Sequence, residues 1–295
     1  MLQDFPNKMQ KLVKLGRPKI VIGLYQGRMN DEIAKSVQKA QKELADVVVV
    51  GAPVEDVFQS IEAGPEMEEI HDKMVEVIKN GKVDGVVRGN VEEHGLLRKL
   101  KTIYTPDMPE NELRIQNPSI IEDIHGNRLI IGPTSTVWGR NNQEKIFWVD
   151  SAIKFLAEFG YKKPKLGFLT SIRKANYKKT TVENEDTLWS YGTWESAEYL
   201  VKYYQKKGYE AKNYEIHVEH AVADNCDIVC VAEGPMGNAM FRGAMFLGGL
   251  KILASPRMAL GIPYEDDSQS ETDYYPHILF ATAWVNGKKK GELKM

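Results

Sequence analysis

Residues 227–243 read D-I-V-C-V-A-E-G-P-M-G-N-A-M-F-R-G. The segment begins with an apolar run, 228–231, that is typical of a strand buried on both faces. Gly234-Pro235 and Gly237-Asn238 then interrupt the chain before a helical pattern at 239–247. A strand, a glycine turn and a helix start in this order predict backbone N–H groups that face an anionic ligand. We therefore expect a ligand site at the carboxyl end of this strand.

Strand and helix patterns alternate on both sides of this segment. Further strands are expected at 19–24, 47–51, 83–87, 165–170, 212–218 and 251–254, and further helices at 31–44, 67–78, 92–100, 141–159 and 193–207. Such alternation predicts α/β units built on parallel sheets. Residues 120–131 differ, because two apolar runs flank His125-Gly126-Asn127 and predict a tight antiparallel hairpin. The polar stretch 171–189 is predicted to be a loop.

Composition and charge indicate a well-cored globular protein. The chain has 295 residues, of which 42% are hydrophobic and 27% charged. The 39 basic and 41 acidic side chains give a formal charge of -2, which argues against non-specific binding of nucleic acid. Residues 1–19 lack the apolar core of a signal peptide, and no run approaches membrane-spanning length. With only Cys226 and Cys230 present, we expect a reducing cytoplasm and no membrane partner.

Three loops directly follow apolar strands, at 86–90, 131–136 and 254–257. In open α/β sheets such loops line the ligand cleft. Arginine side chains there could form paired hydrogen bonds with a phosphate or carboxylate, and hydroxyl groups could donate to it. The alternative is that these are ordinary turn residues and surface arginines. The predicted ligand-binding residues are Arg88, Gly89, Asn90, Thr134, Ser135, Thr136, Gly234, Gly237, Asn238, Arg242, Ser255 and Arg257, with Ser255 and Arg257 as the catalytic candidates.

Several of these segments resemble motifs of a known family. Two motifs are similar to motifs of phosphate acetyl- and butyryltransferases: V-D-G-V-V-R-G at 83–89 and F-G-Y-K-K-P-K-L-G-F-L at 159–169. Residues 227–229, Gly237-Asn238 and Arg242 fall where that family has an aspartate-led strand, a Gly-Asn pair and a basic residue, and Ser255 and Arg257 fall near its Ser-Arg pair. The sequence more closely resembles the MtxX group, also called methanogenesis marker protein 4. Its members are shortened relatives named for a methyltransferase subunit.

The resemblance implies a two-domain α/β protein with the phosphate acyltransferase or isocitrate-dehydrogenase-like fold and an interdomain cleft. The first domain would comprise 1–138 plus 249–295, and the second 139–248. The implied protein is a transferase or transferase subunit of one-carbon metabolism in a methanogenic archaeon. It would bind a phosphorylated or carboxylated small molecule in the cleft, with methyltransferase partner subunits and a homodimeric assembly.

Two alternatives stay open. One is a phosphate acetyl/butyryltransferase that moves an acyl group between coenzyme A and phosphate, which would make either molecule a ligand. The family's Asp-Gly-Pro motif is absent from 213–225, which speaks against ordinary acyl transfer. The other alternative is a non-catalytic sensor or assembly partner on the same scaffold.

Metal and nicotinamide sites are not expected. His217, Glu219 and His220 are ligand-type residues, but they would straddle the end of the strand at 212–218 and would not converge. The acidic segment 265–267 could hold Mg²⁺, although solvated surface is the expected role. No G-x-G-x-x-G motif follows the first strand, so nicotinamide binding is not predicted. Asp123 to Gly126 begins like a cobalamin-binding pattern, yet Arg128 stands where that pattern needs glycine.

Overall fold

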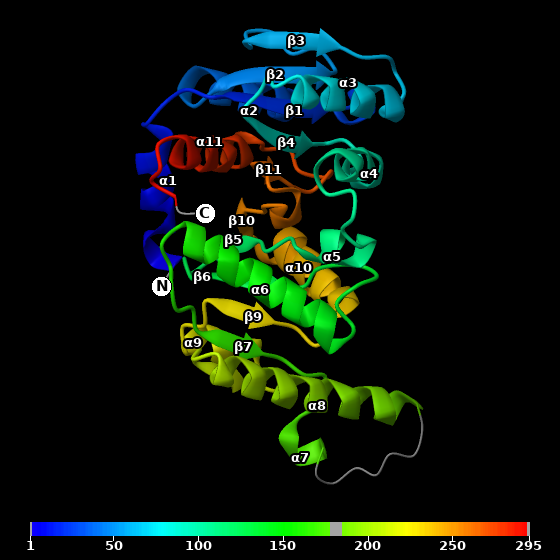
Figure 1. Ribbon diagram of the computed structural model, residues 1–295, viewed down its shortest axis with the longest axis vertical. Coiled ribbons are helices and arrows are strands. Elements are labelled where there is room, and N and C mark those ends of the chain that lie inside the picture. The colour runs from blue at the N-terminus through cyan, green and yellow to red at the C-terminus, as the bar shows by residue number, and fades with distance from the viewer. Residues whose placement is uncertain (1, 178–184, 294–295) are drawn as a thin grey trace. The chain divides into compact units, whose positions relative to one another are not determined.

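The computed structural model describes residues 2–177 and 185–293 (Figure 1). The chain divides into two compact units. We call Asp4–Pro109 with Leu253–Met295 the terminal unit, and Glu110–Ile252 with Met1–Gln3 the central unit. Residues 110–138, which the sequence analysis assigned to the first domain, group with the central unit, because the hairpin they contain pairs within that unit's sheet.

The sheet of the terminal unit has five strands in the order β11-β4-β1-β2-β3, and every pair in it is parallel. Its strands are β1 (Lys19–Leu24), β2 (Asp46–Gly51), β3 (Gln59–Glu62), β4 (Gly85–Gly89) and β11 (Tyr264–Glu265). Almost every residue of β1, β2 and β4 is buried. Burial on both faces explains why these strands read as continuous apolar runs.

Helices cover both faces of this sheet. They are α1 (Phe5–Val13), α2 (Asp31–Glu43), α3 (Met67–Lys79), α4 (Glu93–Tyr104) and α11 (Tyr275–Lys289), with 3-10 turns η2 (Gln26–Arg28) and η3 (Met258–Leu260). A further 3-10 turn, η1 (Leu2–Asp4), contains the chain's passage from the central unit to the terminal unit. Side chains of α2 and α11 pack on Ile20, Ile22 and their neighbours. On the opposite face α3 approaches β1 closely, since a Cβ at Gly23 would lie 2.4 Å from the Met74 sulfur. The last apolar run of the sequence is thus a buried helix, α11, with α1 beside it.

The sheet of the central unit has the order β10-β5-β6-β9-β7-β8. Its strands are β5 (Ile120–Glu122), β6 (Arg128–Gly132), β7 (Leu166–Phe168), β8 (Ala211–Asn213), β9 (Ile228–Cys230) and β10 (Lys251–Ala254). β6, β9, β7 and β8 are parallel, whereas β5 is antiparallel to β6. The predicted hairpin is therefore confirmed, and Asp123 closes it by accepting hydrogen bonds from the backbone N–H groups of His125 and Asn127.

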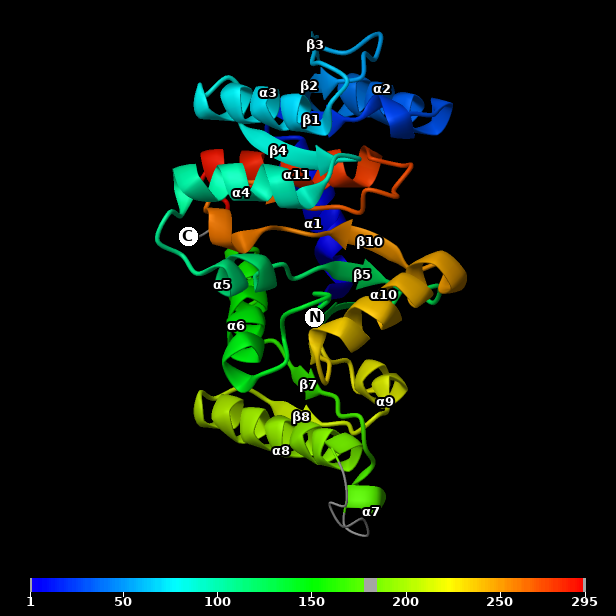
Figure 2. The same ribbon diagram turned by 90° about the vertical axis from the view of Figure 1, so that its right-hand side faces the viewer.

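The helices of the central unit are α5 (Glu110–Ile115), α6 (Asn142–Glu158), α7 (Lys174–Tyr177), α8 (Glu185–Lys206), α9 (Val218–Ala223) and α10 (Gly234–Gly248). α6 and α8 pack on one face of the sheet, where Phe168 stacks on Tyr204 with ring centroids 5.9 Å apart. Met236 and Met240 of α10 pack with the cluster around Val229 on the other face, together with residues of α9. Figure 2 shows the ribbons of α9 and α10 near each other.

Two predicted elements differ from the structure. The expected strand at 212–218 is only a short strand, β8, after which the chain turns and enters α9. The expected loop at 171–189 contains α7, and α8 begins at Glu185, ahead of the predicted start at Thr193. Part of that predicted loop, 178–184, lies outside the described residues. Within the described ranges, no helix has the length and hydropathy needed to cross a bilayer.

Candidate functional site

The predicted ligand-binding residues fall into two groups. Arg88, Gly89, Asn90, Ser255 and Arg257 belong to the terminal unit, and Thr134, Ser135, Thr136, Gly234, Gly237, Asn238 and Arg242 belong to the central unit. Most of them follow the carboxyl ends of strands, as their positions after apolar runs predicted. We describe each group within its own unit.

In the terminal unit, the two arginines contact protein carboxylates. Arg88 Nε donates to Asp266 Oδ1 at 2.6 Å, and Arg88 Nη1 donates to the carbonyl of Val91 at 2.8 Å. Arg257 Nη2 donates to Asp266 Oδ2 and to Glu93 Oε1, the latter at 2.7 Å. Both guanidinium groups are buried. We expected these guanidinium groups to donate hydrogen bonds to an anionic ligand. In the structure they donate to carboxylates of the protein itself.

The acidic segment Glu265–Asp267 is buried, and the expectation of solvated surface was wrong. These residues are at most 5% exposed. β11 ends at Glu265 beside β4, which carries the segment into the interior next to Arg88. Burial alone would raise the pKa of Asp266, but Arg257 and Arg88 hold it below its usual range. Burial raises the pKa of Asp267 to about 7.

A buried histidine completes this cluster. His277 Nδ1 lies 2.8 Å from Glu265 Oε1, and the backbone N–H of Ser255 donates to both oxygens of Glu265 at 2.9 and 2.8 Å. Burial alone would lower the pKa of His277, but the hydrogen bond to Glu265 and the charge of Asp267 raise it to about 9. The backbone of Ser255, a catalytic candidate, thus helps to fix the acidic segment.

The His277–Glu265 pair predicts a pH-dependent stability. The pKa of His277 is about 9 in the folded protein against 6.5 ordinarily, so its stabilisation is complete below pH 6.5 and is lost as the pH rises to about 9. We expect the free energy of unfolding to fall by on the order of 3 kcal/mol across that interval. His277→Gln, which keeps a donor for Glu265, should flatten the profile in urea denaturation. If the free energy of unfolding changed equally with pH in the variant and the wild type, His277 would be excluded as the cause of the pH dependence.

In the central unit, the loop at 133–139 packs on the first turn of α10. Asn238 Nδ2 donates to the carbonyl of Thr134 at 2.7 Å, and Ser135 Oγ accepts from the backbone N–H of Trp138 at 2.9 Å. A Cβ at Gly234 would lie 1.9 Å from the Trp138 carbonyl oxygen. Glycine is required here because two backbone segments touch.

The predicted turn at Gly237-Asn238 is instead part of α10, and neither residue has a positive φ. The helix begins at Gly234, earlier than its pattern suggested, because Pro235 is well placed in a first turn. Arg242 lies farther along the same helix, about 12 Å beyond Gly234 by helical rise. It is exposed, lies one helical turn beyond Asn238, and its guanidinium group lies over the Phe246 ring, 5.2 Å from the ring centroid.

The residue before α10 does not cap the helix with its own side chain. Its N-cap residue, Glu233, is extended and makes no side-chain cap hydrogen bond. Glu233 Oε2 instead accepts a hydrogen bond from Trp189 Nε1 at 3.4 Å. The positive end of this 15-residue helix therefore lies just beyond the carboxyl end of β9 and receives no cap from the Glu233 side chain.

Lys145, in the first turns of α6, is a functional candidate that sequence reasoning missed. It is 3% exposed, and its Nζ donates to Ser196 Oγ at 2.9 Å. That hydroxyl donates in turn to Asn142 Oδ1 at 2.6 Å. Among the described residues no carboxylate forms an ion pair with Lys145, and burial lowers its pKa. The charge of this ammonium group is poorly compensated by the protein.

The sequence does carry a signal for Lys145. Trp148, Val149 and Ala152 follow it at the three-, four- and seven-residue spacings of one helix face, and all three are buried. A lysine on such a face is unusual, because buried lysines need a partner for their charge.

Comparison with known proteins places these features in context. No protein-family model matches the chain. "Putative methyltransferase mtx subunit X" of Methanosarcina barkeri is 23% identical over 257 residues, which cover 86% of this chain and 89% of that protein. The protein of the same name in Methanosarcina mazei is 24% identical over 258 residues, with 86% of each chain covered. The chain is similar to the mtx subunit X proteins. The resemblance to the MtxX group is thereby confirmed.

Solved structures share the fold. A branched-chain phosphotransacylase from Enterococcus faecalis has a TM-score of 0.62 at 15% identity, covering 90% of this chain and 99% of its own. The EutD phosphotransacetylase from Staphylococcus aureus has a TM-score of 0.61 at 15% identity, covering 96% and 99%. A 4-hydroxythreonine-4-phosphate dehydrogenase from Burkholderia phymatum reaches 0.51 at 13%, covering 92% and 98%. The predicted α/β fold class is confirmed.

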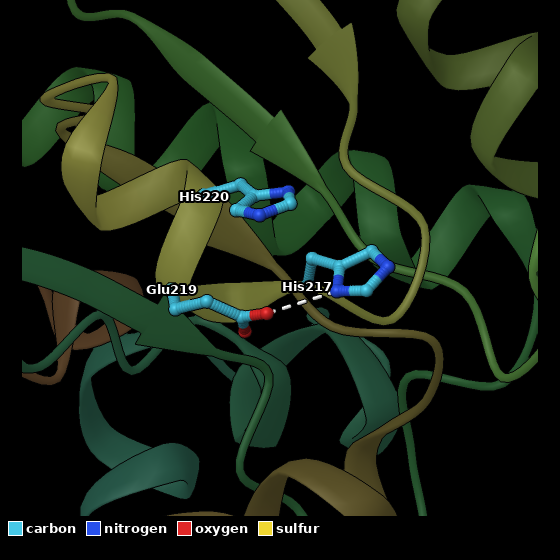
Figure 3. A group of neighbouring side chains, drawn as sticks. All are labelled: His217, Glu219 and His220. Atoms are coloured by element: carbon cyan, nitrogen blue, oxygen red, sulfur yellow. Dashed lines mark hydrogen bonds and ion pairs between the residues drawn. The ribbon is translucent and has the colours of Figure 1, made fainter.

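One further group of side chains corrects an expectation. His217, Glu219 and His220 do converge, because Val218–Ala223 is a helix and not the end of a strand (Figure 3). His217 is the N-cap residue of α9, and the other two lie in its first turn.

Proposed function

We propose that this protein is a transferase, or a subunit of one, that binds a small phosphorylated or carboxylated molecule at Lys145 of the central unit. The buried ammonium group of Lys145, with one hydroxyl partner and no ion pair among the described residues, is the observation that carries the proposal. The similarity to proteins named as a methyltransferase subunit supports the transferase class.

The electrostatics around Lys145 favour an anion. Lys145 lies in the first turns of α6, where the helix dipole is positive and a cation is disfavoured. Burial lowers the pKa of Lys145, and the nearby Cys230, Glu233 and Glu144 only partly offset this effect. A phosphate or carboxylate would pair with the ammonium group.

The arginine cluster of the terminal unit is less suited to this role. Arg88 and Arg257 already share Asp266, so an incoming anion would have to replace a buried carboxylate. Breaking such a pair leaves an uncompensated charge, which is costly. Within the described part of the chain, Lys145 has no comparable carboxylate partner to lose.

Anion titration tests the proposal. Phosphate, sulfate or acetate should raise the melting temperature of the wild type, and a ligand at a hundred times its dissociation constant adds about 2.7 kcal/mol. Lys145→Met should lose this response. It should also be more stable than the wild type without anion, because it removes a buried charge. Since burial lowers the pKa of Lys145, wild-type anion affinity should fall as the pH rises through that lowered pKa.

Lys154→Met is the matched control, because Lys154 is an exposed lysine of the same helix. It should respond to anions as the wild type does. Equal anion responses in Lys145→Met and the wild type would exclude Lys145 as the ligand-binding residue.

Acyl transfer between coenzyme A and phosphate is the second candidate function. Its support is the convergence of both catalytic candidates on the buried acidic segment, where Arg257 contacts Asp266 and the backbone of Ser255 contacts Glu265. Purified protein with acetyl- or butyryl-coenzyme A and phosphate should then release coenzyme A, and Ser255→Ala should slow the release. Anion binding at Lys145 without turnover would favour the third class, a non-catalytic sensor or assembly partner.

A further inference from the structure

Three side chains of metal-ligand type lie together on the surface of the central unit, apart from Lys145. His217 Nδ1 lies 2.9 Å from Glu219 Oε1. The rings of His217 and His220 stack with centroids 4.6 Å apart and planes inclined by 22°. One ligand atom from each of the three residues lies within 4.8 Å of the other two (Figure 3).

The backbone before α9 is built to hold His217 at this place. Glu215 has a positive φ of 60°, which is rare for a residue with a side chain. Its N–H donates to Asn213 Oδ1 at 2.8 Å, its carbonyl accepts from the Thr170 N–H at 2.7 Å, and its Oε2 accepts from the Lys174 N–H at 2.8 Å. These three hydrogen bonds fix the turn that leads into α9. His217 therefore starts the helix from a restrained position.

We propose that His217, Glu219 and His220 bind one divalent transition-metal ion of the zinc class. Two imidazole nitrogens with one carboxylate oxygen are a common three-residue zinc set, and Ni²⁺, Co²⁺ and Cu²⁺ accept the same donors. Mg²⁺ and Ca²⁺ prefer all-oxygen sites and do not suit two imidazoles. Three protein ligands leave a fourth tetrahedral position for water or a substrate.

The site needs only side-chain rotation to close on a metal. Bonds of about 2.0–2.1 Å to zinc place tetrahedral ligand atoms roughly 3.3 Å apart. The His217–Glu219 separation of 2.9 Å is slightly shorter than this, whereas the three ligand atoms as a set lie within 4.8 Å of one another. The stacked rings must turn so that a nitrogen of each faces the ion. The side chains of His217 and Glu219 are 28% and 63% exposed, which leaves room for this movement.

The proposal is tested by calorimetric titration of chelator-treated protein with Zn²⁺ alone, which measures the affinity and the number of ions bound per chain. The wild type should bind one ion per chain, with an affinity in the micromolar range. His217→Ala and His220→Ala should each weaken binding by at least about tenfold, since even indirect support of a metal ligand is worth that much. Co²⁺ bound to the wild type should give the visible absorption of a four-coordinate nitrogen and oxygen site.

His125→Ala is the matched control, because His125 is an exposed histidine in the hairpin turn between β5 and β6. It should bind Zn²⁺ as the wild type does. Lys145→Met should also keep its Zn²⁺ site, which separates this proposal from the proposed function. Unchanged affinity in His217→Ala and His220→Ala would overturn it, and so would the absence of one-to-one binding in the wild type. Circular dichroism with chelator present checks that each variant is folded.

Discussion

Asp266→Ala is expected to destabilise the terminal unit by about 3–5 kcal/mol. Asp266 is buried and accepts hydrogen bonds from both Arg88 and Arg257. Its removal leaves two buried guanidinium groups short of negative charge, and water cannot readily replace the lost oxygens. The midpoint of urea denaturation, followed by a probe in the terminal unit, measures the loss.

Asp72→Ala provides the surface comparison. Asp72 also forms an ion pair, with Lys99 at 2.5 Å, but its side chain is 66% exposed. Exposed pairs contribute about 0–1 kcal/mol, so this variant should remain close to the wild type. If Asp266→Ala lost no more stability than Asp72→Ala, the buried cluster would not have the structural role that its geometry indicates.

Gly237→Val should cost about 3 kcal/mol or more, at the upper end of the penalty for forced overpacking. A Cβ at Gly237 would lie 2.1 Å from the carbonyl oxygen of Pro133, and backbone cannot move aside as a flexible side chain can. α10 must then separate from the loop at 133–139. A thermal melt monitored in the central unit should show a large decrease in midpoint.

Gly243→Val is the matched substitution on the same helix. Nothing lies within 4 Å of a Cβ at Gly243, and valine exceeds glycine in helix propensity. We expect this variant to equal or slightly exceed the wild type in stability. Similar melting temperatures for both variants would contradict the close approach of α10 to the loop.

Much of the fold could be predicted from patterns within the sequence. Apolar runs such as 19–24 and 47–51 are buried strands, and the turn at His125-Gly126-Asn127 joins an antiparallel pair. The prediction of one strand over 212–218 was wrong, because alternation of polar and apolar residues is also compatible with a short strand followed by a six-residue helix. So short a helix owes its stability to packing, not to its own pattern.

The candidate site was less accessible to sequence reasoning. Arg88 and Asp266 are 178 positions apart, so no local sequence pattern could predict that they form an ion pair. The acidic segment therefore looked like surface, although its charges are matched inside the protein. Lys145 could have been noticed from its place on an apolar helix face, whereas its lack of an ion pair depends on what α8 brings beside it.

The discontinuous terminal unit has a consequence for how the protein is made. Its sheet needs β11, and one face needs α11, yet both are translated only after the whole central unit. Domains usually fold in the order of their synthesis, but here residues 4–109 cannot complete their core until residues 264–289 arrive. The nascent chain therefore carries the unpaired edge of β4 through most of translation, and the face around Ile20 and Ile22 is covered by α2 without α11. That exposed surface is a natural substrate for chaperones, and premature termination after residue 252 would leave it uncovered permanently.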